Sequence, residues 1–389
     1  MADEELIIPD STGEAEEDIF DKTLRAIEEN KLNKEKGIYN SIPFGLPSLD
    51  KHLPGVMKGM QYLVTASSGV GKTQLTKFLF INQPYKFIKA HPELELKLKI
   101  LCFALEESKE EFMLGLISHR LKEVYNIGIG VLELRSLGNY TLSTEVLLKI
   151  KECRDYFKEL GQSLEIIDTI SNPFGIYKYV RNYAKNNGTF HYKEIVIEGK
   201  VEKVFDHYEA NDPKEFVVVI IDHMSLLQPE STPDTNTLHL AMTKMSAEYC
   251  RKMITKHFKY CAALVQQQAA EKEKQQYTMS GGSIESKLEP SLDGLGDNKL
   301  TQRDALIVLG LFAPERYEIE RHLDYDIKIL RDNYRSITIL KNRIGTPNLK
   351  KGFFFNGQTN TFAELPPAKS EEMKLIYEKI KNSRLRQQS

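Results

Sequence analysis

The chain has 389 residues, of which 41% are hydrophobic and 28% are charged, and its formal net charge is −2. This composition suits a globular protein with one large core or two smaller ones, and the near-neutral charge means that nucleic-acid binding would need a local basic surface. No apolar run is long enough to span a membrane, and the N-terminal segment is acidic, unlike a secretory signal. We therefore expect a cytoplasmic protein with no membrane partner.

The four cysteines lie far apart in the chain and form no Cys-x-x-Cys pair. Such spacing favours reduced thiols in the core over a zinc site. The four positions are Cys102, Cys153, Cys250 and Cys261.

The first part of the chain divides into two segments. Residues 1–18 are polar and acidic and are expected to form a mobile tail. Residues 19–42 are predicted to form an amphipathic linker helix followed by a linker, because four apolar residues recur at helical spacing. These four are Ile19, Phe20, Leu24 and Ile27.

Residues 43–366 contain short apolar runs that alternate with helical stretches, and many of the runs are rich in branched side chains. Such runs are typical of parallel strands that are buried on both faces. The pattern predicts an α/β fold with a mostly parallel central sheet flanked by helices. The predicted strands are 61–65, 98–105, 164–169, 217–227, 261–267, 305–312 and 336–342.

Two further segments differ from this pattern. Residues 189–212 alternate between apolar and polar side chains around a Glu198-Gly199-Lys200 turn, which predicts an inserted β-hairpin. Residues 367–389 are highly charged and are expected to be a solvated C-terminal tail, either helical or frayed.

The segment ASSGVGKT, residues 66–73, matches a phosphate loop except that Ala66 replaces the first glycine. Backbone N–H groups of such a loop converge on phosphate oxygens, Lys72 contacts the β and γ phosphates, and the Thr73 hydroxyl reaches Mg²⁺. A small-residue turn with a chance Gly-Lys-Thr is the alternative. The pattern predicts ATP and Mg²⁺ as ligands, with nucleotide contacts from Ser68, Gly69, Val70, Gly71, Lys72, Thr73 and Gln74.

Acidic residues follow two of the predicted strands, and ATP hydrolysis needs a held metal and an oriented water. Asp222 follows five apolar residues and is predicted to hold Mg²⁺ together with Thr73, although an aspartate at a strand end also suits a turn. Glu106 ends another strand and is predicted to polarise the attacking water. Its alternative is a favourable interaction with the dipole of the next helix.

A third strand ends in a glutamine. Gln266 follows the apolar residues of 261–265, and a side chain at this strand end would lie beside the γ-phosphate and sense its presence. The neighbours Gln267 and Gln268 are judged less well placed.

Together, the alanine-first loop, Glu106, the Asp222-His223 pair and the glutamine-ended strand resemble the DnaB-like replicative helicases. These are RecA-type hexameric ring helicases, and the motif style is similar to that of the helicase domains of phage primase-helicases. The resemblance extends over about residues 43–366 and implies a RecA-like phosphate-loop ATPase core. It further implies an ATP-dependent DNA helicase, a homo-hexamer with ATP sites at subunit interfaces, in a bacterial cell or a phage-infected host.

The same resemblance assigns further residues. The segment ILKNRIGTPNLKKGFFFNG looks like the family's last hairpin, in which Lys341 and Arg343 would reach the ATP held by the neighbouring subunit. Residues 269–299 correspond to the loop that lines the central channel. DNA phosphate contacts are expected there from Lys272, Lys274 and Lys287 and from the backbone N–H groups of Gly294 and Gly296.

The resemblance implies movement on single-stranded DNA from 5′ to 3′ and leaves a primase or a loading protein open as a partner. Two other functions are compatible with a RecA-like core. One is a RecA/RadA-like recombination ATPase that forms filaments on DNA. The other is a signalling or loading ATPase that acts only on proteins.

Overall fold

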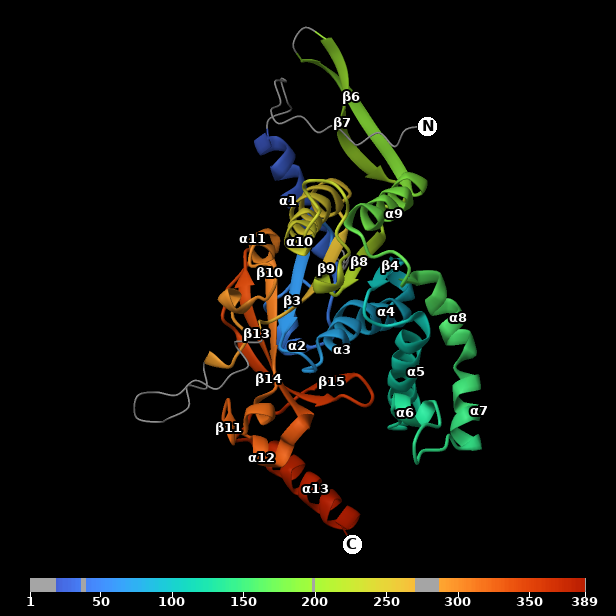
Figure 1. The fold of residues 1–389 in the computed structure, drawn as a ribbon, viewed down its shortest axis with the longest axis vertical. Coiled ribbons are helices and arrows are strands. Elements are labelled where there is room, and N and C mark those ends of the chain that lie inside the picture. Colours follow the sequence, from blue (N-terminus) through green and yellow to red (C-terminus); the bar gives the residue numbers. More distant parts are fainter. Residues whose placement is uncertain (1–18, 36–39, 198–199, 270–286, 389) are drawn as a thin grey trace.

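The computed structural model describes residues 19–35, 40–197, 200–269 and 287–388. A nine-stranded sheet with the strand order β15-β14-β13-β10-β3-β9-β8-β4-β5 runs through its centre (Figure 1). The strands from β10 to β5 are parallel, and β13, β14 and β15 extend the sheet with antiparallel pairs. The sheet strands are β3 (Gln61–Ala66), β4 (Lys97–Ala104), β5 (Leu164–Ile167), β8 (Glu215–Asp222), β9 (Cys261–Gln267), β10 (Ile307–Phe312), β13 (Tyr334–Asn342), β14 (Lys350–Asn356) and β15 (Thr361–Glu364).

Helices cover both faces of this sheet, which confirms the α/β fold expected from the sequence. Ile100 and Leu101 are adjacent in β4 and both fully buried, and their side chains enter the cores on opposite faces. Because both faces of such a strand are buried, its sequence is a continuous apolar run without polar alternation. The helical elements include α1 (Ile19–Glu35), α3 (Lys72–Lys77) continued by η1 (Phe78–Asn82) and α4 (Gln83–Ala90), α5 (Lys109–Tyr125), the short α6 (Val131–Leu134), α7 (Thr144–Glu152), α8 (Arg154–Ser163), α9 (Pro173–Asn186), α10 (Leu238–Lys244) continued by η4 (Met245–His257), and α13 (Glu371–Gln388).

The register fixes which strand ends meet. Ala104 at the end of β4 pairs with Asp222 at the end of β8, and Ala66 at the end of β3 pairs with Gln267 of β9. These carboxyl ends form one edge of the sheet, which is where open α/β sheets bind their ligands. The antiparallel strand β13 ends at the opposite edge, because Asn342 pairs with Ile307, which also pairs with Tyr62 near the start of β3.

The expected hairpin is present as β6 (Gly188–Ile197) and β7 (Lys200–Ala210). Figure 1 shows it projecting from the body at the end of the molecule where α1 lies. Its base is packed onto the domain: the rings of Phe190 and Phe258 are 5.7 Å apart, and the Tyr208 and Tyr260 hydroxyls are 3.1 Å apart. The predicted turn residues Glu198 and Gly199 lie outside the described residues.

The two end segments differ in their packing. The predicted linker helix is α1, whose side chains Ile19 and Ile27 are 69% and 59% exposed. The C-terminal segment was expected to be solvated, but α13 buries Met373 completely, and the Tyr377 hydroxyl accepts a hydrogen bond from the amide of Asp326. One face of this charged helix therefore belongs to the fold.

All four cysteines are buried and free. Among the described residues, no helix is long and apolar enough to cross a membrane.

Candidate nucleotide-binding and catalytic site

The phosphate loop leaves the end of β3 and needs glycine at two positions. Gly69 and Gly71 have φ values of 66° and 113°, which residues other than glycine rarely adopt. A Cβ atom on Gly71 would also lie 3.2 Å from the ring of Phe355. Ala66 is the last residue of β3 and does not have a positive φ, so its methyl group is compatible with the backbone conformation there.

Lys72 begins α3, the first part of a helical segment that continues to Ala90. Its side chain is 8% exposed, and its Nζ donates a hydrogen bond to the carbonyl oxygen of Ser67 at 3.0 Å. The cation thus lies beside the loop at the positive end of a helix. This combination of groups is suited to a phosphate.

Asp222 is nearly fully buried, and its side chain is hydrogen-bonded to that of Thr73. Burial raises the pKa of Asp222 to about 6, against the lowering effect of the Thr73 hydrogen bond. Within the described chain, its buried Oδ1 atom has no hydrogen-bond partner. A hydroxyl and an orphaned carboxylate oxygen are hard oxygen donors of the kind that Mg²⁺ takes, so these two residues fit the metal.

Glu106 lies close to this pair. Its Oε2 atom is 3.7 Å from Nε2 of His223, and its side chain is 56% exposed. Burial lowers the pKa of His223, against the raising effect of the Glu106 carboxylate. Strand pairing explains the proximity, since the amide of Leu105 donates to the carbonyl oxygen of Asp222 at 2.7 Å. Glu106 therefore has a solvent-exposed carboxylate beside His223, the residue that follows Asp222.

Gln266 is placed differently from the expectation. Its side chain is fully buried, its amide donates to the carbonyl oxygens of Gly296 at 2.5 Å and Asn298 at 2.7 Å, and its Oε1 accepts from the Thr301 hydroxyl at 2.5 Å. Both polar atoms of the Gln266 side chain are therefore bonded to the segment 296–301, and the side chain is not directed at the phosphate loop. Its neighbour Gln267, which pairs with Ala66 and is partly exposed, lies nearer to the loop.

Several residues were expected to contact DNA, and the structure describes three of them. Lys287 is exposed. The amide of Gly294 donates to Ser291 and that of Gly296 donates to Gln267, so neither N–H group is directed at a phosphate in this conformation. The expected backbone contacts are thus not supported. Lys272 and Lys274 lie outside the described residues.

Lys341 and Arg343 lie at the edge of the sheet opposite to the phosphate loop. Lys341 donates to the carbonyl oxygens of Gln302 and Arg303, and Arg343 donates to Arg303 at 3.1 Å. The strand length from Tyr62 to Ala66 separates this edge from the loop, which amounts to about 13 Å at 3.3 Å per residue. Neither cation can serve the phosphate loop of its own chain.

Two arginines outside the residues predicted for the site contact the loop. Arg316 donates to the carbonyl oxygen of Ser68, and Arg335 donates through Nε to that of Val70 at 2.8 Å. The Arg335 guanidinium lies 4.4 Å from the centroid of the Phe355 ring. No local motif marks these arginines: Arg335 comes from the antiparallel strand β13, whereas Arg316 follows the carboxyl end of the parallel strand β10.

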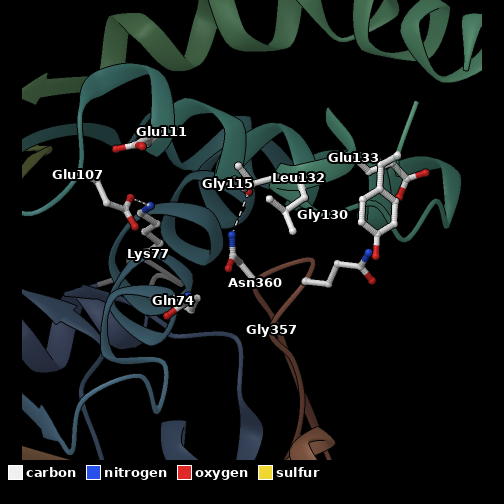
Figure 2. A pocket seen from close by; sticks show the side chains of 13 residues that line it. Gln74, Lys77, Glu107, Glu111, Gly115, Gly130, Leu132, Glu133, Gly357 and Asn360 are labelled. Atoms are coloured by element: carbon white, nitrogen blue, oxygen red, sulfur yellow. Dashed lines mark hydrogen bonds and ion pairs between the residues drawn. The ribbon is translucent and has the colours of Figure 1, made fainter. Parts of the chain in front are cut away.

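A cavity of about 330 Å³ lies beside this site, between α3, α5, α6 and the turn that joins β14 to β15 (Figure 2). Gln74 and Lys77 of α3 form part of its wall. Figure 2 also shows the amide of Asn360 donating to the carbonyl oxygen of Gly115, at 3.2 Å, which attaches the turn to α5.

The arrangement agrees with solved structures. A DnaB-like replicative helicase, described with its interactions with primase, superposes with a TM-score of 0.63 at 17% identity, covering 90% of this chain and 68% of that one. The chain has the fold of a DnaB-like helicase ATPase domain. A second structure, an ATPase domain solved on its own, superposes with a TM-score of 0.65 at 18% identity, covering 90% of this chain and 100% of that chain.

This likeness confirms, at the level of the fold, the resemblance that the sequence motifs predict. No protein-family model and no curated protein matches the sequence. At these identities the RecA-like ATPase fold is what the comparisons establish, and a fold by itself does not determine a ligand or a reaction.

Proposed function

We propose that this protein is an ATP-dependent DNA helicase that hydrolyses ATP with Mg²⁺ at the phosphate loop. The observation that carries the proposal is the convergence of Thr73, Asp222 and Glu106 at the carboxyl edge of the sheet beside Lys72. A phosphate loop alone binds nucleotide, whereas hydrolysis also needs a metal site and a group that orients water.

Each residue has a separate task in this mechanism. Lys72 and the N–H groups of the loop bind the phosphates and neutralise charge that builds up in the transition state. Thr73 and Asp222 would hold Mg²⁺, which would supply positive charge to offset that of the phosphates. Glu106 accepts a hydrogen bond from the attacking water and aligns it with the γ-phosphorus, and its exposed carboxylate lets that water enter from solvent.

The position of Lys341 and Arg343 supports sites shared between subunits. Both cations lie at the far edge of the sheet, so any contact with a transferring phosphoryl group must come from a neighbouring copy. An arginine supplied in trans stabilises transition-state charge and makes turnover depend on the subunit contact. We therefore propose a homo-hexameric ring in which Lys341 and Arg343 of each subunit reach the ATP bound by the neighbouring subunit.

Exposed apolar side chains support the same assembly. Leu24, Ile27 and Leu32 of α1 are 39%, 59% and 47% exposed. A second exposed group follows α5, where Leu132 and Leu148 are 58% and 54% exposed. We propose that α1 of one copy packs on the α6–α7 region of the next copy, which would bury both apolar surfaces.

Single-stranded DNA is the proposed substrate for movement. The segment 291–299 belongs to the expected channel loop. It is bound to the end of β9 by Gln266 and by Gln268, whose amide donates to the carbonyl oxygen of Ser291 at 3.1 Å and to the Thr65 hydroxyl at 3.0 Å. Thr65 immediately precedes Ala66, so a change at the phosphate loop can reach this segment through two residues. Movement from 5′ to 3′ and the involvement of a primase or loader extend this proposal and rest on the resemblance alone.

A forked-duplex assay tests the proposal. The purified chain should separate the strands when ATP and Mg²⁺ are present, and a Lys72→Ala variant should not. Electron microscopy with ATP then distinguishes closed rings from filaments on DNA. ATP hydrolysis with filaments and without strand separation would instead support a recombination ATPase, and ATP hydrolysis that DNA does not influence would support a protein-directed ATPase.

A further inference from the structure

Lys77 is a buried cation that the mechanism above does not use. It lies on α3, five positions after Lys72, and is 4% exposed. Its Nζ is 2.6 Å from Oε2 of Glu107 and 3.7 Å from the centroid of the Phe112 ring. Figure 2 shows this pair at the wall of the cavity beside the site.

A buried ammonium group is costly unless a partner compensates it, and a well-packed apolar side chain of similar size would stabilise a helix at least as well. The pair is also asymmetric, because the Glu107 side chain is 32% exposed while that of Lys77 is 5% exposed. An apolar side chain of this size could therefore also pack α3 against α5. What the charge adds is the ion pair with Glu107 and the contact with the Phe112 ring.

Glu107 follows directly after Glu106. On the other side of Glu106, the amide of Leu105 donates to Asp222 at 2.7 Å, which fixes the chain to the metal-site strand. The Lys77 ion pair fixes the next residue to the helix that carries Lys72 and Thr73. Glu106 thus lies between two attachments, one to each element that forms the nucleotide site.

We propose that Lys77 is a positioning residue for ATP hydrolysis, which holds Glu106 at the place from which it orients water. The inference rests on the proposed function, since it assigns a role within the same site. It concerns the catalytic step and not nucleotide binding, because Lys77 forms its ion pair away from the loop itself, with Glu107.

The test compares steady-state ATP hydrolysis by Lys77→Met with that by Lys77→Arg. We expect Lys77→Met to lower kcat by about 10-fold to 100-fold, the size of effect that small misplacements of a catalytic group produce, with KM for ATP within about 2-fold. Lys77→Arg keeps the charge and should recover most of kcat. The chain offers a matched control in Lys89→Met, since Lys89 forms an ion pair with Glu159 of the same 2.6 Å length, with both side chains 52% exposed; this variant should retain full activity.

A double variant separates positioning from the simple cost of an unpaired charge. Lys77→Met with Glu107→Gln leaves no charge unpaired, so its melting temperature should be near that of the parent. If kcat stays as low as in Lys77→Met, the ion pair itself positions Glu106. Recovery of kcat in the double variant, or a folded Lys77→Met protein with parental kcat, would overturn the inference.

The parent chain and Lys72→Ala complete the design. If the parent shows no ATP hydrolysis that Lys72→Ala abolishes, the proposed function fails. If that hydrolysis is present and Lys77→Met leaves it unchanged, only the role of Lys77 fails.

Discussion

The side chain of Thr73 is hydrogen-bonded to that of Asp222, which joins the first turn of α3 to the end of β8. One residue comes from the phosphate loop and the other from a strand far along the chain. Their contact turns two separate sequence patterns into one candidate metal site.

Burial of Asp222 predicts an unusual pH dependence of stability in the metal-free protein. Its pKa is raised to about 6, so the folded state favours the protonated form, and stability is lost as pH rises from the ordinary aspartate pKa through 6. Asp222→Asn removes this cost. In EDTA at pH 8, the variant should have a higher free energy of unfolding by about 3 kcal/mol, since one pKa unit equals about 1.4 kcal/mol.

Urea unfolding at several pH values measures this difference. The advantage of Asp222→Asn should shrink between pH 6 and pH 4. A difference that is the same at all pH values would contradict the account of burial. With Mg²⁺ present, the same variant should lose ATP hydrolysis.

Glu106→Gln should remove turnover and leave nucleotide binding intact. The amide keeps the size of the side chain but is a far weaker acceptor for the proton of the attacking water, so we expect kcat to fall by about 10²-fold to 10⁴-fold. Fluorescent nucleotide titration should give a Kd close to that of the parent. Glu110→Gln, at an exposed position of α5, is the control and should hydrolyse ATP normally. Normal turnover by Glu106→Gln would exclude its assignment as the group that orients water.

Arg343→Ala should lose turnover while still binding ATP, because its own loop lies at the other edge of the sheet. Mixing this variant with Lys72→Ala gives a sharper measurement. Some shared sites then combine an intact Lys72 with an intact Arg343 from the neighbour, about a quarter of them after random exchange, and hydrolysis should partly return. If Arg343 acted only within its own subunit, no mixture would regain activity. Lys351→Ala, at an exposed position of β14, serves as the control for removal of a surface cation.

The glutamines at the end of β9 should have separable effects. Gln266→Leu removes the hydrogen bonds to Gly296 and Asn298, so stimulation of ATP hydrolysis by single-stranded DNA should be lost while basal hydrolysis remains. Gln267→Leu should lower basal hydrolysis, since Gln267 pairs with Ala66 beside the loop. ATPase rates with and without an oligonucleotide measure both effects. The reverse assignment would restore Gln266 as the sensor of the γ-phosphate.

Local sequence determined the parts of the protein whose physics is local. The continuous apolar run before Asp222 predicts a buried parallel strand, because both faces of that strand are covered by helices. Gly69 and Gly71 mark the phosphate loop, because they adopt backbone angles that other residues rarely reach. Local sequence also marks Glu106 and Asp222 as acidic residues that follow apolar runs, whereas the pairing of β4 with β8 brings these two strand ends together.

Only the tertiary structure decided which side chains of neighbouring elements meet. Gln266, Gln267 and Gln268 are consecutive in the sequence. Hydrogen bonds to the segment 291–301 determine which of these side chains are buried. The antiparallel direction of β13 determines that Arg343 lies at the edge away from the loop. The ion pair of Lys77 with Glu107 depends on the packing of α3 beside α5. Such a contact has no sequence signature, because it joins residues of two packed elements that are not related by a fixed spacing in the chain.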